Sequence, residues 1–303
     1  MTKADKFKGI LLAVISSVCV SLVYITSRIV QQTMPTDLFI LWWFAFASIW
    51  ALVILIIKRK DFSCYIGKVK EFRLFFLYFI ISETFGAFFF FYVIKFVNPS
   101  IVSFVGSITP LFVAIIAFFY INEKLSLREI TGGIISVSGV ILITYVSPDI
   151  PVKYTLLILS VVVVYSFNNV LIKKKTKDIP PILITLVRIF FLFLTFLAYK
   201  ISSGLIRLPN QNELFFLFLG SLLGPILGMF ALFSSLKFIK STQVSLIKNS
   251  QPFLVVLFSY FFLKTTITNE QLLAGTLIII GISLMISDKR LNLRAILNRF
   301  VKN

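Results

Sequence analysis

The second half of this chain repeats the first at a fixed spacing of 142 residues, without a gap. The aligned positions include glycines and prolines, the residues that most strongly shape or interrupt a helix. The aligned pairs are Gly86 with Gly228, Lys95 with Lys237, Val102 with Val244, Ser103 with Ser245, Pro110 with Pro252, Gly133 with Gly275, and Gly139 with Gly281. A repeat of this kind in an apolar chain predicts two membrane bundles that face each other across a central site, an arrangement typical of transporters.

Composition identifies lipid as the expected solvent. The chain is 58% hydrophobic and 14% charged, whereas soluble domains are about 45–50% apolar and about 25% charged. Histidine is absent, and the two cysteines, Cys19 and Cys64, lie far apart in sequence and in expected depth. We therefore expect no disulfide and no metal site.

Ten segments are long and apolar enough to cross a hydrocarbon core of roughly 30 Å. They cover residues 9–30, 36–57, 73–96, 99–121, 128–146, 154–173, 181–201, 213–238, 241–262 and 270–286. The first of them follows three lysines, as a signal peptide would, but it is too long for a signal peptide and lacks a small-residue cleavage site. The sequence thus predicts an all-α polytopic membrane protein with ten transmembrane helices.

The positive charges predict how these spans are oriented. If the N-terminus is cytoplasmic, 22 of the 30 Lys and Arg residues fall on the inner side, 6 fall on the outer side and 2 lie inside spans. This asymmetry places both termini in the cytoplasm. It also assigns the net charge of +18 to an anionic inner leaflet of the cytoplasmic membrane rather than to nucleic acid.

Five spans in each half have a further consequence, because corresponding helices then run in opposite directions. The repeat is expected to be inverted, with one five-helix unit over residues 1–146 and a second over residues 147–287. Residues 288–303 form a basic amphipathic tail that we expect to lie on the cytoplasmic membrane surface.

Several short motifs resemble the drug/metabolite transporter superfamily, in particular EamA-type transporters. In the first half they are Asn98-Pro99-Ser100, the stretch from Ser107 to Phe112, and Asn122-Glu123-Lys124. In the second half they are Ser241 and the stretch from Ser250 to Phe253, although the closing glutamate is missing before Lys264. The resemblance covers nearly the whole chain. It implies secondary transport, often export, of small metabolites or amino acids by alternating access, without a cofactor.

Three ionisable residues lie near the middle of predicted spans: Glu83, Arg188 and Lys248. Each carries a penalty of about 2.5–3.5 kcal/mol in lipid, so each needs a reason to be there. Facing one cavity, they would sum to two positive charges and one negative, which favours a zwitterion or an organic anion. Two alternatives stay open at this point. Glu83 and Arg188 can form a structural ion pair, and Lys248 can extend its ammonium to the nearby interface.

Pro110 and Pro252 lie at the centres of the fourth and ninth spans, where each is expected to kink its helix. Each proline leaves a backbone carbonyl without its usual donor, that of Gly106 or of Lys248. Polar and small residues spaced by three or four positions form a stripe on each of these helices. The residues of the stripes that we expect to line the transport pathway are Ser103, Ser245 and Lys248, flanked by Asn249 and Gln251. Alternatively, the prolines only shape the bundle.

Asn169 and Tyr24 are further candidates for the cavity wall, with hydrogen bonding between helices as the equal alternative. Glu83 is the deep group able to couple protons to transport. An enzyme is not expected, since the chain has no histidine, no paired carboxylates in mid-membrane and no nucleophile motif. The expected function is therefore a secondary transporter, with a proton-coupled exporter of cationic drugs that uses Glu83 as the alternative. Substrate identity, coupling ion and the choice between monomer and homodimer stay open.

Overall fold

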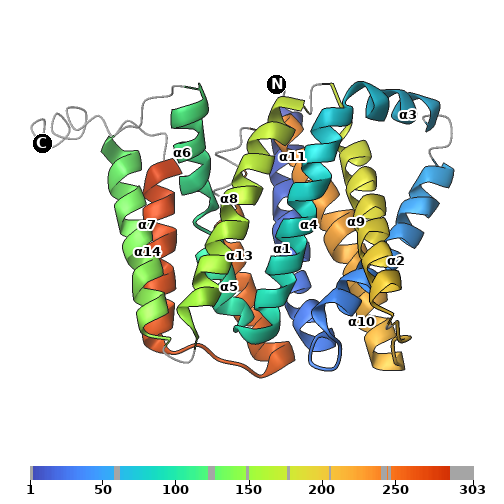
Figure 1. Cartoon of the computed structure of the whole chain (residues 1–303). Helices are drawn as coiled ribbons and strands as arrows, with labels where there is room; N and C mark the ends of the chain where they lie inside the picture. The colour runs from blue at the N-terminus through green and yellow to red at the C-terminus, as the bar shows by residue number, and fades with distance from the viewer. Residues whose placement is uncertain are drawn as a thin grey trace, which may run out of the picture.

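The computed structural model describes residues 3–57, 62–121, 127–147, 150–175, 178–204, 206–239, 244 and 247–286. Within these residues the chain forms helices and no strand. Most helices run along one common direction and form a single bundle (Figure 1). Two apolar clusters of buried side chains fill it, one centred on α2 and α9 and the other on α5, α7 and α14.

The first half of the chain ends at α7, and the second half begins with α8. The first half contains α1 (Lys3–Val30), α2 (Thr36–Ile57), α3 (Phe62–Glu71), α4 (Arg73–Phe96), α5 (Pro99–Gly106), α6 (Thr109–Ile121) and α7 (Leu127–Tyr145). The second half contains α8 (Val152–Lys175), α9 (Pro181–Ser203), α10 (Gln211–Ser221), η2 (Leu222–Gly228), α11 (Met229–Phe238), α13 (Gln251–Phe258), η3 (Ser259–Leu263) and α14 (Asn269–Ile286).

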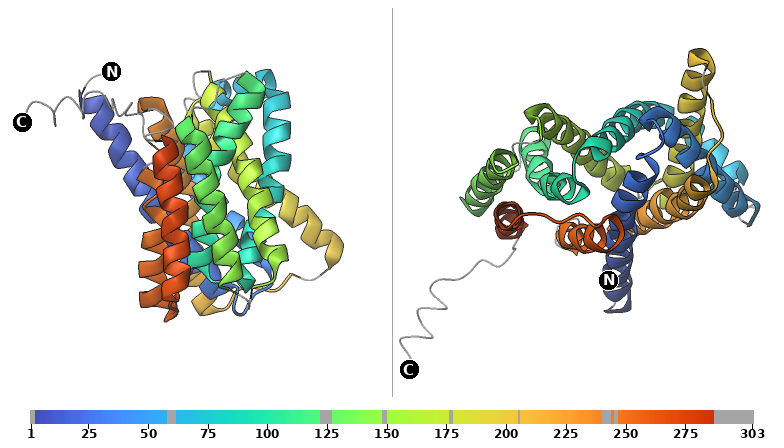
Figure 2. Two further views of the ribbon diagram at one scale, coloured as in Figure 1. Left: turned by 90° about the vertical axis from the view of Figure 1, so that its left-hand side faces the viewer. Right: turned by 90° about the horizontal axis from the view of Figure 1, so that it is seen from below.

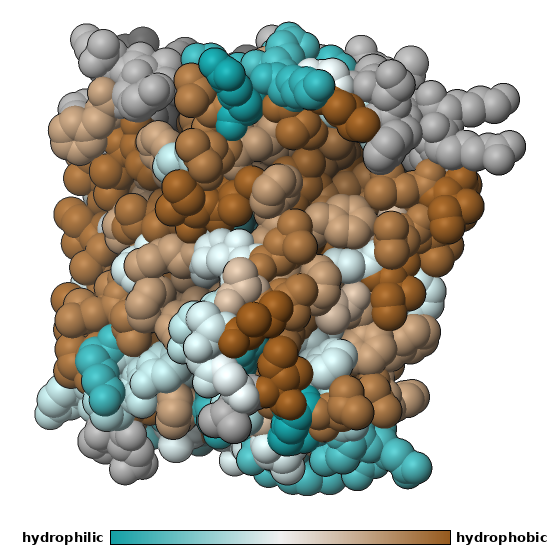
Figure 3. Space-filling view, turned by 45° about the vertical axis from the view of Figure 1, so that its right-hand side comes forward, coloured by the Kyte–Doolittle hydropathy of each residue, from teal (hydrophilic) through white to brown (hydrophobic). Residues whose placement is uncertain are grey.

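Seven helical stretches in the described residues are long and apolar enough to span a membrane, and three shorter apolar helices accompany them. The three shorter ones, Ile130–Tyr145, Gln251–Leu263 and Asn269–Leu284, lie in the predicted fifth, ninth and tenth spans. The number of ten spans therefore stays a prediction. Hydrophobic side chains cover the middle of the visible surface, with hydrophilic residues toward its two ends (Figure 3). This pattern, together with the helices, makes the chain an integral, multi-pass membrane protein.

α3 was not predicted, because its residues fall in a segment that we expected to be a basic loop. It lies across one end of the bundle, beside the beginning of α4 (Figure 1). Its apolar residues Tyr65, Ile66 and Val69 share one helical face, and the Lys68 ammonium donates a 2.6 Å hydrogen bond to the Asp178 carbonyl. The short amphipathic pattern was present in the sequence, but the surrounding lysines concealed it.

The predicted fourth span is interrupted by a two-residue turn at Ser107 and Ile108, where Ser107 keeps helical backbone angles, so the kink expected at Pro110 stays a prediction. α5 ends at Gly106 and α6 begins at Thr109, with Pro110 as its second residue, a position where the missing N–H of proline costs nothing. We had expected the Gly106 carbonyl to be without a donor. Instead, the Thr109 hydroxyl donates a 2.7 Å hydrogen bond to it. In the second half, α13 begins at Gln251, 142 residues after Thr109, and Pro252 is again the second residue.

The last helices of the two halves, α7 and α14, lie side by side and antiparallel (Figures 1 and 2). A Cβ added to Gly139 would lie 2.9 Å from the Ile278 nitrogen and 3.0 Å from the Ala274 oxygen. A Cβ added to Gly281 would lie 2.6 Å from the Ser136 nitrogen and 2.5 Å from the Gly132 oxygen. Each contact of the first glycine thus has its counterpart 142 residues away in a contact of the second.

Candidate functional site

A buried ion pair joins α4 to α9. Glu83 Oε2 lies 2.5 Å from Arg188 Nε, and the two residues are only 2% and 8% exposed. The other oxygen of the carboxylate accepts a 2.9 Å hydrogen bond from the Asn168 amide on α8. The Asn168 carbonyl in turn accepts from the Ser82 hydroxyl at 3.0 Å. Both oxygens of Glu83 are therefore satisfied within the bundle, which is what burial of a charge requires.

Aromatic side chains enclose this pair. The Arg188 guanidinium lies 5.4 Å from the centre of the Phe44 ring, a distance suited to a cation–π interaction. Tyr165 lies against Gly86, one helical turn beyond Glu83, where a Cβ would be 3.0 Å from the tyrosine hydroxyl. Tyr165 interacts electrostatically with both Glu83 and Arg188. The absent side chain of Gly86 thus lets α8 approach α4 at this point.

Sequence reasoning singled out the two charges of this cluster but did not commit to its other members. Asn169 was the predicted asparagine, whereas Asn168 contacts Glu83; Asn169 itself is half-buried. Adjacent residues of a helix point about 100° apart, so only one of the two can face α4. Tyr165 was missed, and its only signal was an aromatic hydroxyl in an otherwise apolar span.

A second polar cluster lies at the break before α13. Asn249 and Gln251 are 6% and 8% exposed, and the Asn249 Nδ2 and Gln251 Oε1 atoms have no hydrogen-bond partner among the residues that the structure describes. Lys248 is half-buried and forms no ion pair or hydrogen bond with any residue that the structure describes. The cluster touches α1, where the Ser21 hydroxyl lies 3.4 Å from the Gln251 carbonyl. These groups could bind a polar molecule without losing an existing partner.

The remaining predicted residues lie around the first break. The Tyr24 ring packs edge-on against Phe90 at 5.1 Å, and its hydroxyl would be 3.7 Å from a Cβ at Gly106. The Ser103 hydroxyl is buried and donates to the Ser100 carbonyl at 2.7 Å.

The structure thus brings Glu83 and Arg188 together, and it places Lys248, Asn249 and Gln251 in a separate group. Among the described residues, no hydrogen bond or ion pair connects the two groups. Ser245 lies outside the described residues. Because Glu83 neutralises Arg188, Lys248 is the one of the three mid-span charges that pairs with none of the residues that the structure describes.

A third polar network lies at the end of the bundle opposite α3. Arg207 donates to both carboxylate oxygens of Glu213, at 2.6 and 2.8 Å, and the Thr33 hydroxyl donates to Glu213 at 2.6 Å. Asn210 and Glu213 also form a capping box at the start of α10. The hydrogen bonds from Arg207 to Glu213 raise the pKa of the guanidinium above its ordinary value. The network ties the turn after α1 to the segment before α10.

The described part of the chain contains no group of three or more His, Cys, Asp or Glu side chains that could hold a metal ion.

Comparisons with known proteins agree with the two-part organisation of the sequence. The profile described as "EamA-like transporter family" matches residues 7–145 and again residues 152–287. One solved structure, titled only "Crystal structure of protein", is similar over 94% of this chain and 98% of its own, with a TM-score of 0.66 and 15% identity. At that identity the likeness concerns the fold alone. No curated protein matches the sequence.

Proposed function

Since the chain belongs to the EamA-like transporter family, we propose that it exports small zwitterions or organic anions, such as amino acids, by alternating access. In this proposal ten helices form two inverted five-helix units in the cytoplasmic membrane, with both termini in the cytoplasm. The reciprocal contacts of Gly139 and Gly281 support the inverted arrangement, because an axis that exchanges α7 with α14 would produce them. The positions of the Lys and Arg residues support the orientation.

The observation that carries the proposal is the unpaired polar cluster at the start of α13. Buried polar groups are normally hydrogen-bonded, so two buried amide atoms that lack a described partner beside a lysine suggest a site for a ligand. Lys248 and the Asn249 amide are donors and suit a carboxylate, whereas Gln251 Oε1 is an acceptor and suits an ammonium group. A broken helix that presents such groups is a recurring feature of secondary transporters.

Recognition of a carboxylate can be tested with the full-length protein in proteoliposomes. A panel of radiolabelled amino acids and dicarboxylic acids should include at least one solute that shows saturable counterflow. The methyl ester of that solute should compete poorly, and Lys248→Gln should reduce the flux at least tenfold. Lys264→Gln, at an exposed lysine, is the matched control and should transport normally. Equal competition by the ester would refute carboxylate recognition.

The alternative, export of cationic drugs through Glu83, is less consistent with the geometry. A cation would have to displace Arg188, which already pairs with Glu83 at 2.5 Å. Flux of a quaternary amine that is lost in Glu83→Gln but retained in Lys248→Gln would favour this alternative.

Glu83 is also our candidate for proton coupling, because protonation would remove the charge that holds Arg188. A proton gradient should then drive transport in the parent protein. In Glu83→Gln the gradient should have no effect, while exchange of substrate for substrate persists. Gradient-driven flux that is unchanged in this variant would exclude the coupling role.

A further inference from the structure

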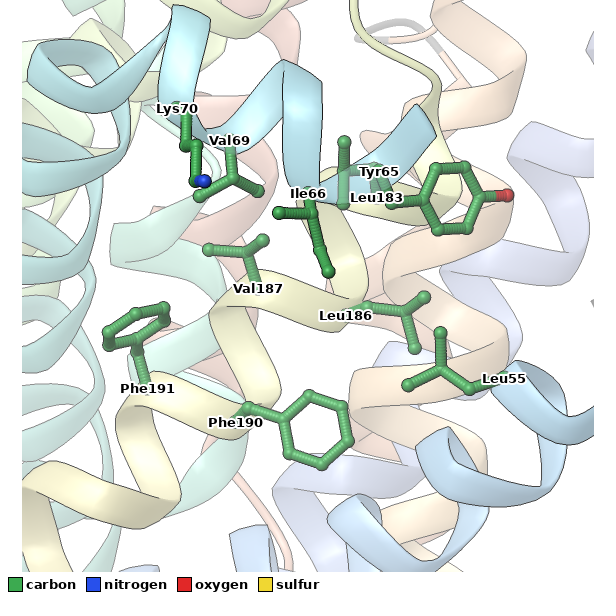
Figure 4. A pocket seen from close by; sticks show the side chains of 10 residues that line it. All are labelled: Leu55, Tyr65, Ile66, Val69, Lys70, Leu183, Leu186, Val187, Phe190 and Phe191. Carbon is green, nitrogen blue, oxygen red and sulfur yellow. The ribbon is translucent and has the colours of Figure 1, made fainter. Parts of the chain in front are cut away.

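An apolar groove lies under α3, where this helix crosses α9 and the end of α2. Its volume is about 320 Å³, near the lower limit for small-molecule sites, which span about 300–1,000 Å³. Val69 of α3 lies above Val187, and Phe190 and Phe191 form the floor (Figure 4). Ile66 and Phe191 are 42% and 40% exposed, so the groove opens to the outside of the bundle.

The opening lies where the hydrophobic surface meets a cationic end of the molecule. Ile56 and Ile57, at the end of α2, are 71% and 77% exposed and continue the apolar surface. Lys70 is the one charged residue that lines the groove, and it forms no ion pair with any residue that the structure describes. Lys68 lies two residues before Lys70 and Arg73 three residues after it. One acidic residue, Glu71, lies between Lys70 and Arg73.

We propose that this groove binds one acyl chain of an anionic phospholipid whose headgroup pairs with Lys70. The apolar walls suit a hydrocarbon chain, and the lysine at the membrane interface suits an anionic headgroup. The hydrogen bond from the Lys68 ammonium to the Asp178 carbonyl connects α3, which covers the groove, to the segment before α9. Lipid binding here does not depend on which substrate the protein transports.

The groove also reaches the turn of α9 that carries Arg188. Its wall on α9 includes Val187, the residue directly before Arg188. A bound chain would therefore contact the turn of α9 that carries the guanidinium. A lipid at this place would stabilise that turn against rotation or bending.

The inference can be tested by native mass spectrometry of the full-length protein, freed of lipid in detergent. Phosphatidylglycerol and phosphatidylcholine with identical chains are then added in turn. The parent protein should retain one phosphatidylglycerol in preference to phosphatidylcholine. Lys70→Gln should weaken this preference about fivefold, the effect expected for one interfacial lysine. Ile66→Trp, which fills the groove from a partly exposed position, should abolish retention of both lipids.

Lys264→Gln, an exposed lysine outside the groove, is the control and should retain phosphatidylglycerol normally. Equal retention of both lipids by the parent protein would overturn the proposal, as would unchanged retention by Lys70→Gln and Ile66→Trp. If the parent protein is a dimer and Ile66→Trp dissociates it, a second copy of the chain covers the groove. This result would also overturn the lipid proposal. Lys70→Gln changes an exposed side chain, so its result stands even if Ile66→Trp fails to fold.

Discussion

The carboxylate of Glu83 on α4 lies 2.5 Å from the guanidinium of Arg188 on α9, and so the only mid-span acid among the three predicted charges is already paired. This contact links the first half of the chain to the second. It also agrees with one of the two alternatives left open by the sequence, in which Glu83 and Arg188 form an ion pair.

The first prediction concerns the stability that this pair provides. Glu83→Gln and Arg188→Gln should each lower the free energy of unfolding by about 3–5 kcal/mol, because each leaves a buried partner without its counter-charge. The double variant should be more stable than either single one. Thermal or denaturant unfolding in detergent provides the measurement.

The pair between Asp37 and Lys200 is the control for this experiment. The Asp37 side chain is 23% exposed, so water can replace the lost contact in Lys200→Gln. The loss should therefore be smaller than at Glu83. Additive losses in the double variant of Glu83 and Arg188 would contradict the assigned coupling.

The second prediction separates function from stability at Gln251. Gln251→Met keeps the approximate shape of the side chain and removes an oxygen that no described residue hydrogen-bonds. We expect the free energy of unfolding to stay within about 1 kcal/mol of the parent value, while flux in proteoliposomes falls at least tenfold. Gln271→Met is the opposite control, since the Gln271 amide donates to the Ser147 hydroxyl at 3.0 Å. It should lower stability and preserve transport.

The sequence repeat predicted at which residues the helices are interrupted better than it predicted the backbone geometry there. Pro110 and Pro252 were expected to kink their helices; each is the second residue of a helical segment that follows a short turn, and the kink itself stays a prediction. Proline alone does not distinguish these outcomes, because it is tolerated in the first turn of a helix and bends an interior. Which outcome occurs depends on local hydrogen bonds, such as the one that the Thr109 hydroxyl donates to the Gly106 carbonyl.

Pairing between distant helices could be predicted only as a set of alternatives. A buried ion pair between Glu83 and Arg188 was one of them, since both lie deep in their spans, but the angular position of each helix decides which neighbours meet. The choice of Asn168 over Asn169 depends on a rotation of about 100° of α8, which an apolar helix does not reveal in its sequence. The same reason explains why Tyr165 was missed.

The third prediction concerns the network at the end opposite α3. Glu213→Gln should lower the free energy of unfolding by about 1–3 kcal/mol, because Glu213 accepts from Arg207, Thr33 and the Asn210 backbone. The loss should be smaller than at Glu83, since the Arg207 side chain is 44% exposed and can be solvated. Glu270→Gln, at an exposed glutamate in the first turn of α14, is the control and should be nearly neutral. Equal losses for the two variants would show that the network does not stabilise the fold.

The last prediction tests the equivalence of the two halves at their shared contact. Alanine at Gly139 or Gly281 would place a methyl group within 3 Å of backbone atoms on the facing helix, where no side-chain rotation can relieve the clash. Each substitution should therefore separate α7 from α14 and lower the free energy of unfolding by about 1–3 kcal/mol. Gly67→Ala, with open space around its Cβ, is the matched control and should stabilise α3 by about 0.5–1 kcal/mol. Because the contacts of Gly139 and Gly281 correspond atom by atom across the repeat, their losses should agree within about 1 kcal/mol when measured in one detergent. A neutral result at one glycine and a large loss at the other would argue against an axis that exchanges the two helices.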